Sequence, residues 1–277
     1  MEATTMSRPK QGLIVAVLLL VAGCTKGIDR PLTTGKDLGA LVASIAEVKR
    51  DMTAKEREAS LWAMNELAPQ LGSQADFHAL YPNATLKQLI RGEVKRVLED
   101  YPKIVAQIEP RKVASDAVLA ELNKIVADES LFSLRRDFFG LKPTITARVS
   151  NNGRLPVSTL QWNASLFIEG KVEPVATSQV YDFYNESFRE ATTSRGFLPG
   201  TKLNRQFSVG FVSGDAAWTT IEIQNAKAPR VQLTVIPGSV KDLADKSYWD
   251  AQQHANLTNE LESKQAAIQS AKSFADI

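Results

Sequence analysis

The sequence predicts an α+β protein with three parts in order: an N-terminal helical region, an antiparallel β-sandwich and a C-terminal helix. Apolar residues recur at spacings of three and four over residues 36–127, and at spacings of two over residues 141–235. Helical spacing returns after Pro237-Gly238. The strand-like runs have no helices between them, and one face of each is polar. This pattern favours antiparallel sheets over a buried parallel sheet.

The first 23 residues have the three parts of a secretory signal. Arg8 and Lys10 supply positive charge, an apolar run follows over residues 12–22, and small residues precede Cys24. The run has roughly 11 residues, whereas a helix that crosses the hydrocarbon core of a bilayer needs about 20. The sequence therefore predicts a signal peptide over residues 1–23 and not a permanent membrane helix.

Cys24 is the only cysteine of the chain, and it ends the stretch LVAGC. This stretch resembles the lipobox of bacterial lipoproteins. The resemblance implies that the Cys24 thiol receives a diacylglycerol, that the signal is cut before Cys24, and that the new amino group is acylated, for example with palmitate. The alternative is a buried structural cysteine in an ordinary secreted protein, but a lone cysteine at a cleavage site has no packing role.

Residues 24–35 lack apolar periodicity and contain Gly27, Pro31 and Gly35, so we expect them to form a tether. The eleven residues that follow Cys24 reach about 40 Å when fully stretched. We therefore expect the folded part to face the periplasm, close to a membrane. The residue after the cysteine is a threonine, which resembles the outer-membrane pattern of enteric lipoproteins and favours the outer membrane over the inner.

Residues 36–128 are expected to form a helical region. An apolar stripe over residues 38–48 predicts its first helix. Thr53 precedes Glu56 by three residues, and Thr85 precedes a glutamine by the same spacing. Both pairs are typical of capping boxes, so a helix should begin after each threonine.

Two further features subdivide the end of this region. Pro102 is expected to disturb the helix that begins after Thr85. Ser115 or Asp116 can cap a fourth helix, whose apolar stripe continues through Ile125 and Val126.

Alternating residues predict strands within residues 129–240. A strand over residues 144–150 ends at Asn151-Asn152-Gly153, which is a strong turn signal. The next strand, over residues 159–168, has apolar side chains on one face and polar side chains on the other. Further strands are expected at residues 180–184, 207–211, 221–223 and 231–235.

The stretches ARVSNNGRLPVSTLQWNASLFIEG and GFLPGTKLNRQFSVGF resemble the small immunoglobulin-like domains of bacterial envelope proteins. In those domains a strand ends in an Asn-Gly turn, and a Leu-Pro-Gly loop precedes another strand. The helical segment before them, SIAE leading into MTAKEREA, resembles a family of uncharacterised bacterial lipoproteins with a helical region before such a sandwich. The resemblance implies an immunoglobulin-like β-sandwich over residues 129–240, and it carries over no catalytic residues.

Residues 241–277 are expected to form the C-terminal helix. Its apolar stripe is thin and broken. We therefore expect a helix that is only partly docked on the rest of the protein and has a frayed end.

The composition argues against several function classes. The chain has 33 basic and 31 acidic residues and a net charge of +2, so it does not resemble a general nucleic-acid binder. Its two histidines, His78 and His254, lie far apart in the sequence, and the common catalytic and metal-binding motifs are missing. We therefore expect neither a metal nor another cofactor, and no enzymatic activity. Both histidines are expected on a surface or at an interface between helices.

The stretch VYDFYNESFRE permits one catalytic alternative. Asp182, Glu186 and Glu190 are close in sequence, and two carboxylates beside a groove can hydrolyse a glycosidic bond. The competing interpretation is an edge strand on which Tyr181 and Phe183 face inward and Asp182 faces outward.

The same stretch also permits a binding patch, formed by Tyr181, Phe183, Tyr184 and Phe188, since aromatic residues concentrate at interface hot spots. Packing of these rings in the core is the alternative. Arg135 and Arg136, which precede Asp137, are expected to be solvated.

These observations favour a membrane-anchored periplasmic lipoprotein that binds or scaffolds an unidentified envelope protein or a peptidoglycan-associated factor. One alternative is an inhibitor or immunity lipoprotein that blocks an envelope enzyme. The other is an envelope glycan hydrolase that uses the carboxylates between Asp182 and Glu190.

Overall fold

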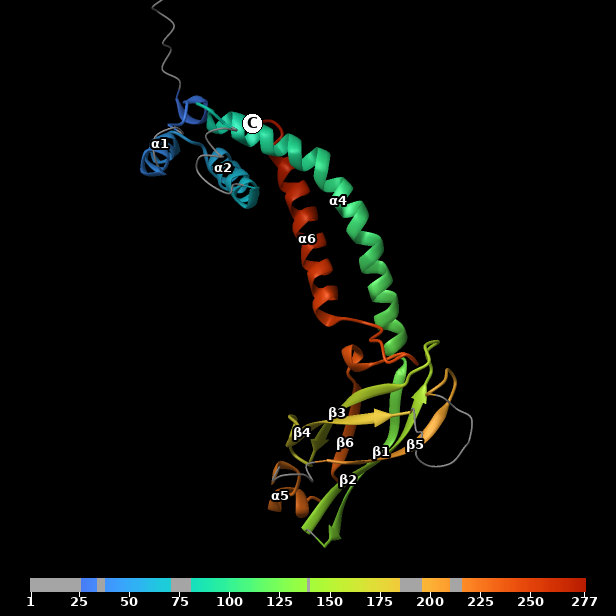
Figure 1. The fold of residues 1–277 in the computed structure, drawn as a ribbon. Helices are drawn as coiled ribbons and strands as arrows, with labels where there is room; N and C mark the ends of the chain where they lie inside the picture. Colours follow the sequence, from blue (N-terminus) through green and yellow to red (C-terminus); the bar gives the residue numbers. More distant parts are fainter. Residues whose placement is uncertain (1–25, 34–37, 71–80, 139, 185–195, 210–215) are drawn as a thin grey trace, which may run out of the picture. The chain divides into compact units, whose positions relative to one another are not determined.

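The structure, a computed structural model, describes residues 26–33, 38–70, 81–138, 140–184, 196–209 and 216–277 (Figure 1). The chain divides into two compact units. The first combines the residues up to Val105 with Ser263–Ile277, and the second is Ala106–Glu262. The expected signal peptide and Cys24 lie outside the described residues, as do His78 and Phe188.

The first unit consists of helices. Its members are α1 (Leu38–Arg50), α2 (Ala54–Leu67), the first part of α4 (Leu86–Leu122) and the end of α6 (Ala251–Ser273). Short 3-10 helices occur in the chain at Gly27–Asp29, Ala68–Gln70, Ala216–Trp218 and Pro237–Ser239.

Both predicted capping boxes are confirmed. At the start of α2, the Glu56 N–H donates to Thr53 Oγ1 at 3.2 Å, and the Thr53 N–H donates to Glu56 Oε2 at 2.8 Å. At the start of α4, the Gln88 N–H donates to Thr85 Oγ1 at 3.1 Å, and the Thr85 N–H donates to Gln88 Oε1 at 2.9 Å. Each box satisfies N–H groups that have no partner within the helix, which fixes where the helix begins.

The predicted third and fourth helices are a single helix, α4, so the expected interruption near Pro102 and the cap at Ser115 or Asp116 are wrong. A proline inside a helix removes one backbone hydrogen bond to the carbonyl four residues earlier. Pro102 and Pro110 are both exposed. Water can therefore solvate the carbonyl that each proline leaves without its helical donor.

The end of α6 is packed, which contradicts the expected frayed end. Ala271 is completely buried and Phe274 is 5% exposed. The Phe274 ring lies 5.5 Å from the Trp62 ring of α2, measured between centroids. The C-terminal residue Ile277 also packs against this cluster, and its carbonyl accepts a hydrogen bond from Arg91 at 3.0 Å. The helix also begins ten residues later than predicted, at Ala251.

The second unit contains two antiparallel sheets. One has the strand order β1-β2-β5, with β1 Ile125–Asp137, β2 Gly140–Asn151 and β5 Lys202–Ser208. The other has the order β4-β3-β6, with β4 Ala176–Phe183, β3 Thr159–Phe167 and β6 Arg230–Val235. Both sheets contribute side chains to one buried cluster, which includes Ile145 of β2 and Trp162 of β3.

Strand β1 was missed by the sequence prediction, which placed Ile125 and Val126 on a helix and named no strand before residue 144. The helix ends at Leu122, and β1 pairs with β2 from Ile125↔Asn151 to Asp137↔Gly140. Two β-branched residues in succession suit a strand better than a helix. Their apolar character, however, also continues the helical stripe that precedes them.

The predicted strand over residues 221–223 is also wrong, because these residues begin the short helix α5 (Ile221–Gln224). Thr220 caps it, since its Oγ1 accepts a hydrogen bond from the Ile223 N–H at 3.3 Å. Ile223 is buried and Ile221 is exposed.

Within the described ranges, no helix has both the length and the apolar composition that a membrane-spanning segment requires.

Candidate functional site

Strand β4 lies at the edge of its sheet with its two aromatic residues pointing outward. Tyr181 is 59% exposed and Phe183 is 55% exposed, whereas Asp182 is completely buried. The prediction that the rings face inward and the carboxylate outward is therefore wrong. The pairing of β3 with β4 explains this. On the buried face of β3, Leu160 lies opposite Asp182 and Trp162 lies opposite Val180. Asp182 and Val180 must therefore face the core as well, which turns Tyr181 and Phe183 outward.

The buried Asp182 carboxylate is held by three partners. Its Oδ2 accepts hydrogen bonds from Trp162 Nε1 at 3.1 Å and from the Tyr184 hydroxyl at 2.6 Å. Its Oδ1 forms an ion pair with the Arg205 guanidinium. A buried carboxylate needs such partners, because an unpaired charge in the core is costly. Asp182 thus has a structural environment and no exposed oxygen, which argues against a role in glycan hydrolysis.

Tyr184 belongs to the core and not to the predicted aromatic patch. It is 7% exposed, and its ring lies 4.6 Å from the ring of Phe197. Burial raises the pKa of the Tyr184 hydroxyl above its usual value, and the nearby Asp182 charge raises it further. The hydroxyl therefore stays protonated and donates a hydrogen bond to the carboxylate. Of the predicted patch, Tyr181 and Phe183 remain as surface residues, while Phe188 lies outside the described residues.

Tyr181 and Phe183 line a groove of about 530 Å³, which we call the β4 groove. Their rings stack with 5.9 Å between centroids and an angle of 7° between planes. The groove combines this aromatic pair with hydroxyl, amide and charged groups. Its other lining residues are Thr159, Gln161, Gly238, Ser239, Lys241 and Asp245.

The segment that follows β6, residues 238–245, forms one side of the β4 groove. Hydrogen bonds fix it to β3 and to Ser158, which directly precedes β3. Ser239 Oγ accepts from the Gln161 N–H at 2.8 Å, and the Lys241 N–H donates to the Thr159 carbonyl at 2.9 Å. Ser158 Oγ donates to Asp245 Oδ1 at 2.9 Å. The Lys241 backbone and the Asp245 carboxylate are therefore held beside the aromatic pair before any ligand arrives.

Sequence reasoning missed this side of the groove. Lys241 and Asp245 lie about sixty positions after Tyr181 in the chain. Both residues were expected on the C-terminal helix, and the Pro237-Gly238 pair gave no sign of which strand the following residues would contact.

His254, expected at a surface or interface, contacts Ser115 and Trp249. Ser115 Oγ accepts a hydrogen bond from Trp249 Nε1 at 2.9 Å and lies 2.9 Å from His254 Nδ1. The Asp116 carboxylate is 3.8 Å from His254 Nε2, and a cleft of about 210 Å³ adjoins Ser115.

A serine beside a histidine is the start of a nucleophilic site, but this serine lies inside helix α4. Backbone N–H groups inside a helix are used by helical hydrogen bonds, so they offer no oxyanion hole. We therefore interpret the Ser115–His254–Trp249 contacts as packing within the second unit.

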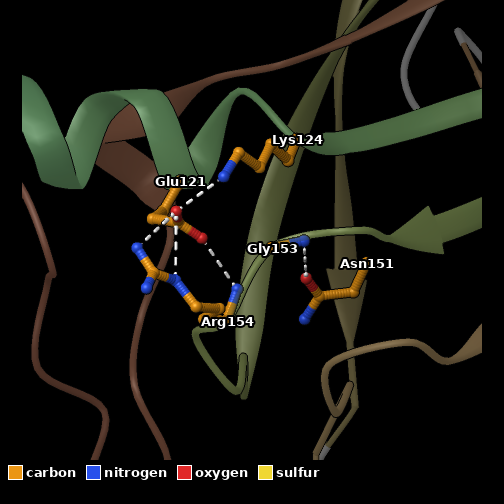
Figure 2. Close-up of polar contacts among 5 residues, drawn as sticks. All are labelled: Glu121, Lys124, Asn151, Gly153 and Arg154. Carbon is orange, nitrogen blue, oxygen red and sulfur yellow. Dashed lines mark hydrogen bonds and ion pairs between the residues drawn. The ribbon is translucent and has the colours of Figure 1, made fainter.

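A polar cluster holds the loop between β2 and β3 against the end of α4 (Figure 2). Glu121, which is 11% exposed, accepts hydrogen bonds from Lys124 Nζ at 2.7 Å and from the Arg154 N–H at 2.9 Å. The Arg154 guanidinium also donates to it, through Nη2 at 3.1 Å. These donors, Lys124 first and Arg154 second, lower the pKa of Glu121 to about 2.

The predicted Asn151-Asn152-Gly153 turn is confirmed in the same cluster. Asn151 Oδ1 accepts from the Gly153 N–H at 3.1 Å, while its amide donates to the carbonyls of Leu155 and Phe197 at 2.8 and 2.9 Å. A Cβ on Gly153 would lie 2.8 Å from the Glu121 carbonyl oxygen. Glycine is therefore required at this position by close approach to α4, and the cluster has a structural role.

Among the residues that the structure describes, no group of three or more histidine, cysteine and acidic side chains is placed to hold a metal ion. Comparisons of the chain with protein-family models, curated proteins and solved structures found no match. The β4 groove is thus chosen as the candidate site on its geometry alone.

Proposed function

We propose that this protein is a lipid-anchored periplasmic binding module whose β4 groove holds an extended segment of another envelope protein. The observation that carries the proposal is the stacked, exposed pair Tyr181 and Phe183 beside a groove with fixed polar walls. Exposed aromatic side chains on the outer face of a strand are not part of the core. They are typical of interface hot spots.

The position of β4 supports a polypeptide partner. In the described part of the chain β4 pairs with β3 alone, so its other edge can receive an added strand. The groove also presents one basic and one acidic side chain, Lys241 and Asp245, close to the rings. An extended peptide can pair with the edge and place alternate side chains on the aromatic pair.

The anchor is proposed from the sequence of residues 8–24. Each buried methylene of an acyl chain contributes about 0.8 kcal/mol, and one chain alone binds a membrane only marginally. Two or three chains on Cys24 would hold the protein at the outer membrane. We further propose that the two antiparallel sheets form an immunoglobulin-like sandwich, an interpretation supported by their shared buried cluster.

Site-specific photo-crosslinking in intact cell envelopes tests the groove. A photoreactive phenylalanine analogue replaces Tyr181 in one variant and Ile221 in a matched control. Ile221 is 75% exposed in the same unit but does not line the groove. We expect a discrete protein adduct from position 181 that is missing from position 221 and that is lost when Phe183→Ser is added.

Three results would contradict the proposal. They are the same adducts from both positions, no adduct from position 181, or an adduct with peptidoglycan in place of protein. Circular dichroism of each variant excludes misfolding as the cause of a lost adduct.

A further inference from the structure

Residues that line the β4 groove form two rows, which cross the sheet from β4 to the segment after β6. The first row begins at Tyr181, which lies opposite Gln161 of β3. It ends at Ser239, whose Oγ accepts a hydrogen bond from the Gln161 N–H at 2.8 Å. This row therefore presents a ring, an amide and a hydroxyl group, all of them uncharged.

The second row ends in a basic residue. Phe183 lies opposite Thr159, and Thr159 forms an isolated β-bridge with Lys241. Residues that lie opposite each other in antiparallel strands point to the same face, so the Lys241 side chain shares the face of Phe183. Because Phe183 follows Tyr181 by two positions, the rows are about 7 Å apart, which is also the spacing of alternate side chains in an extended polypeptide.

Lys241 brings a positive charge into the groove that no acidic side chain neutralises by contact. It is partly buried, and among the described residues its ammonium group forms no ion pair. Asp245, the acidic residue of the groove, accepts instead from Ser158 Oγ at 2.9 Å. The Asp242 carboxylate accepts from two backbone N–H groups of its own turn, at 2.8 and 2.9 Å. Both carboxylates thus hold the segment after β6 in place.

Arg205, a second cation that contacts β4, is already used by the fold. Its guanidinium forms an ion pair with Asp182, donates to the Phe183 carbonyl at 3.1 Å and lies over the Tyr184 ring. Arg205 therefore fixes the strand that carries the aromatic pair. Of these two cations, Lys241 is the one that a ligand in the groove can contact.

We propose that the segment held by the β4 groove carries an acidic side chain two positions away from an uncharged one. This proposal rests on the function proposed above, because it describes the partner of the same site. In the second row the methylene groups of the acid contact the Phe183 ring, and its carboxylate pairs with the Lys241 ammonium group. The uncharged side chain lies in the first row against Tyr181. The charge of Lys241 thereby selects against basic segments.

A random peptide library displayed on phage tests the proposal. The bait is the whole chain after residue 23 with Cys24→Ser, which carries neither leader nor acyl chain and retains every described residue. We expect the enriched peptides to share an aspartate or glutamate two positions from an uncharged residue, and to lose binding to Phe183→Ser. Lys241→Glu reverses the charge of the second row, so it should enrich lysine or arginine at the same position of the peptides.

Affinities of one enriched peptide and of its analogue, in which an amide replaces the acid, measure the charge contact. The amide should weaken binding to the parent about fivefold, and binding to Lys241→Gln by no more than about twofold. Asp245→Asn is the matched control, because it removes the other charge of the groove and keeps an oxygen that can accept from Ser158. The acidic peptide should bind this variant at least as tightly as the parent. Circular dichroism shows whether each variant retains the fold.

The proposal is overturned if the enriched peptides show no excess of acidic residues, or if Lys241→Glu enriches the same peptides as the parent. If such peptides still lose binding to Phe183→Ser, the groove remains a peptide site and only its preference for an acid is wrong. A library without enriched peptides, or peptides whose binding is unchanged by Phe183→Ser, would contradict the function proposed for the groove as well.

Discussion

At the scale of single residues, Glu121 makes the stability of the second unit depend on pH. Its pKa is about 2 in the folded protein, against an ordinary value of 4.5 for a glutamate, so its contacts with Lys124 and Arg154 stabilise the fold above pH 4.5. That contribution is lost as the pH falls from 4.5 towards 2. Glu121→Gln should therefore lower the denaturant midpoint at pH 7, and the difference from the parent should shrink over that interval.

Denaturant unfolding at a series of pH values checks this prediction. Glu173→Gln changes an exposed carboxylate in the same unit and serves as the control. A difference between Glu121→Gln and the parent that stays constant down to pH 2.5 would show that the charge of Glu121 is not what matters.

Gly153 provides a second prediction at this scale. The added Cβ of Gly153→Ala meets the backbone carbonyl of Glu121 at 2.8 Å, so one of the two segments must move. We expect a loss of about 2 kcal/mol in unfolding free energy, in the range of other overpacking substitutions. Gly238→Ala is the matched control, since a Cβ there meets no atom within 4 Å. Equal midpoints for the two variants would contradict the close approach.

Local residue patterns predicted some of these details and not others. The capping boxes at Thr53 and Thr85 and the turn at Gly153 could be predicted, because each depends on residues only two or three positions apart. The direction of Tyr181 and Phe183 could not. A one-residue change of register turns every side chain of a strand to the other face, and the register of β4 depends on its distant partner β3.

At the scale of elements, the packed end of α6 gives a stability prediction. Phe274 is 5% exposed and contacts Trp62, so Phe274→Ala should lower the unfolding free energy of the first unit by about 3 kcal/mol. Leu61→Ala on α2 is the control, because Leu61 is 55% exposed, and it should change stability little. Thermal unfolding followed by circular dichroism measures both. If truncation of Phe274 were as mild as that of Leu61, the end of α6 would be frayed after all.

The two segments that were assigned the wrong type of element, at β1 and α5, share one physical cause. Ile125 and Val126, and likewise Ile221 and Ile223, are β-branched residues in short apolar runs that satisfy either period. The choice between helix and strand is made by contacts outside the run. For β1 this is the pairing with β2, and for α5 it is the cap at Thr220 together with the burial of Ile223.

At the scale of the whole molecule, the sequence predicted the order of helices, sheets and final helix, but not how the chain is divided. The C-terminal helix does not form a part of its own, since residues Ser263–Ile277 belong to the same unit as the residues up to Val105. Contacts between segments that lie far apart in the chain leave no local pattern in the sequence between them. The β4 groove has the same origin, because it joins residues of β3, β4 and the segment after β6.

Removal of the proposed anchor should change where the protein is found. Cys24→Ser takes away the thiol that accepts the acyl chains, so we expect a soluble protein or an uncleaved precursor in place of the membrane-bound mature form. Fractionation of cells into membranes and periplasm measures this. Val15→Ala, which alters the apolar run outside the LVAGC stretch and keeps the thiol, is the control and should fractionate like the parent. A Cys24→Ser protein of mature size that remains in the membrane fraction would count against lipidation.

Mass spectrometry of the N-terminal peptide of the protein, purified from its native membranes, tests the proposed anchor most directly. We expect a peptide that begins at Cys24 and carries the additional mass of its acyl chains. An unmodified peptide that contains both the apolar run over residues 12–22 and the free thiol of Cys24 would contradict the anchor, and with it the proposed place of the protein at the membrane.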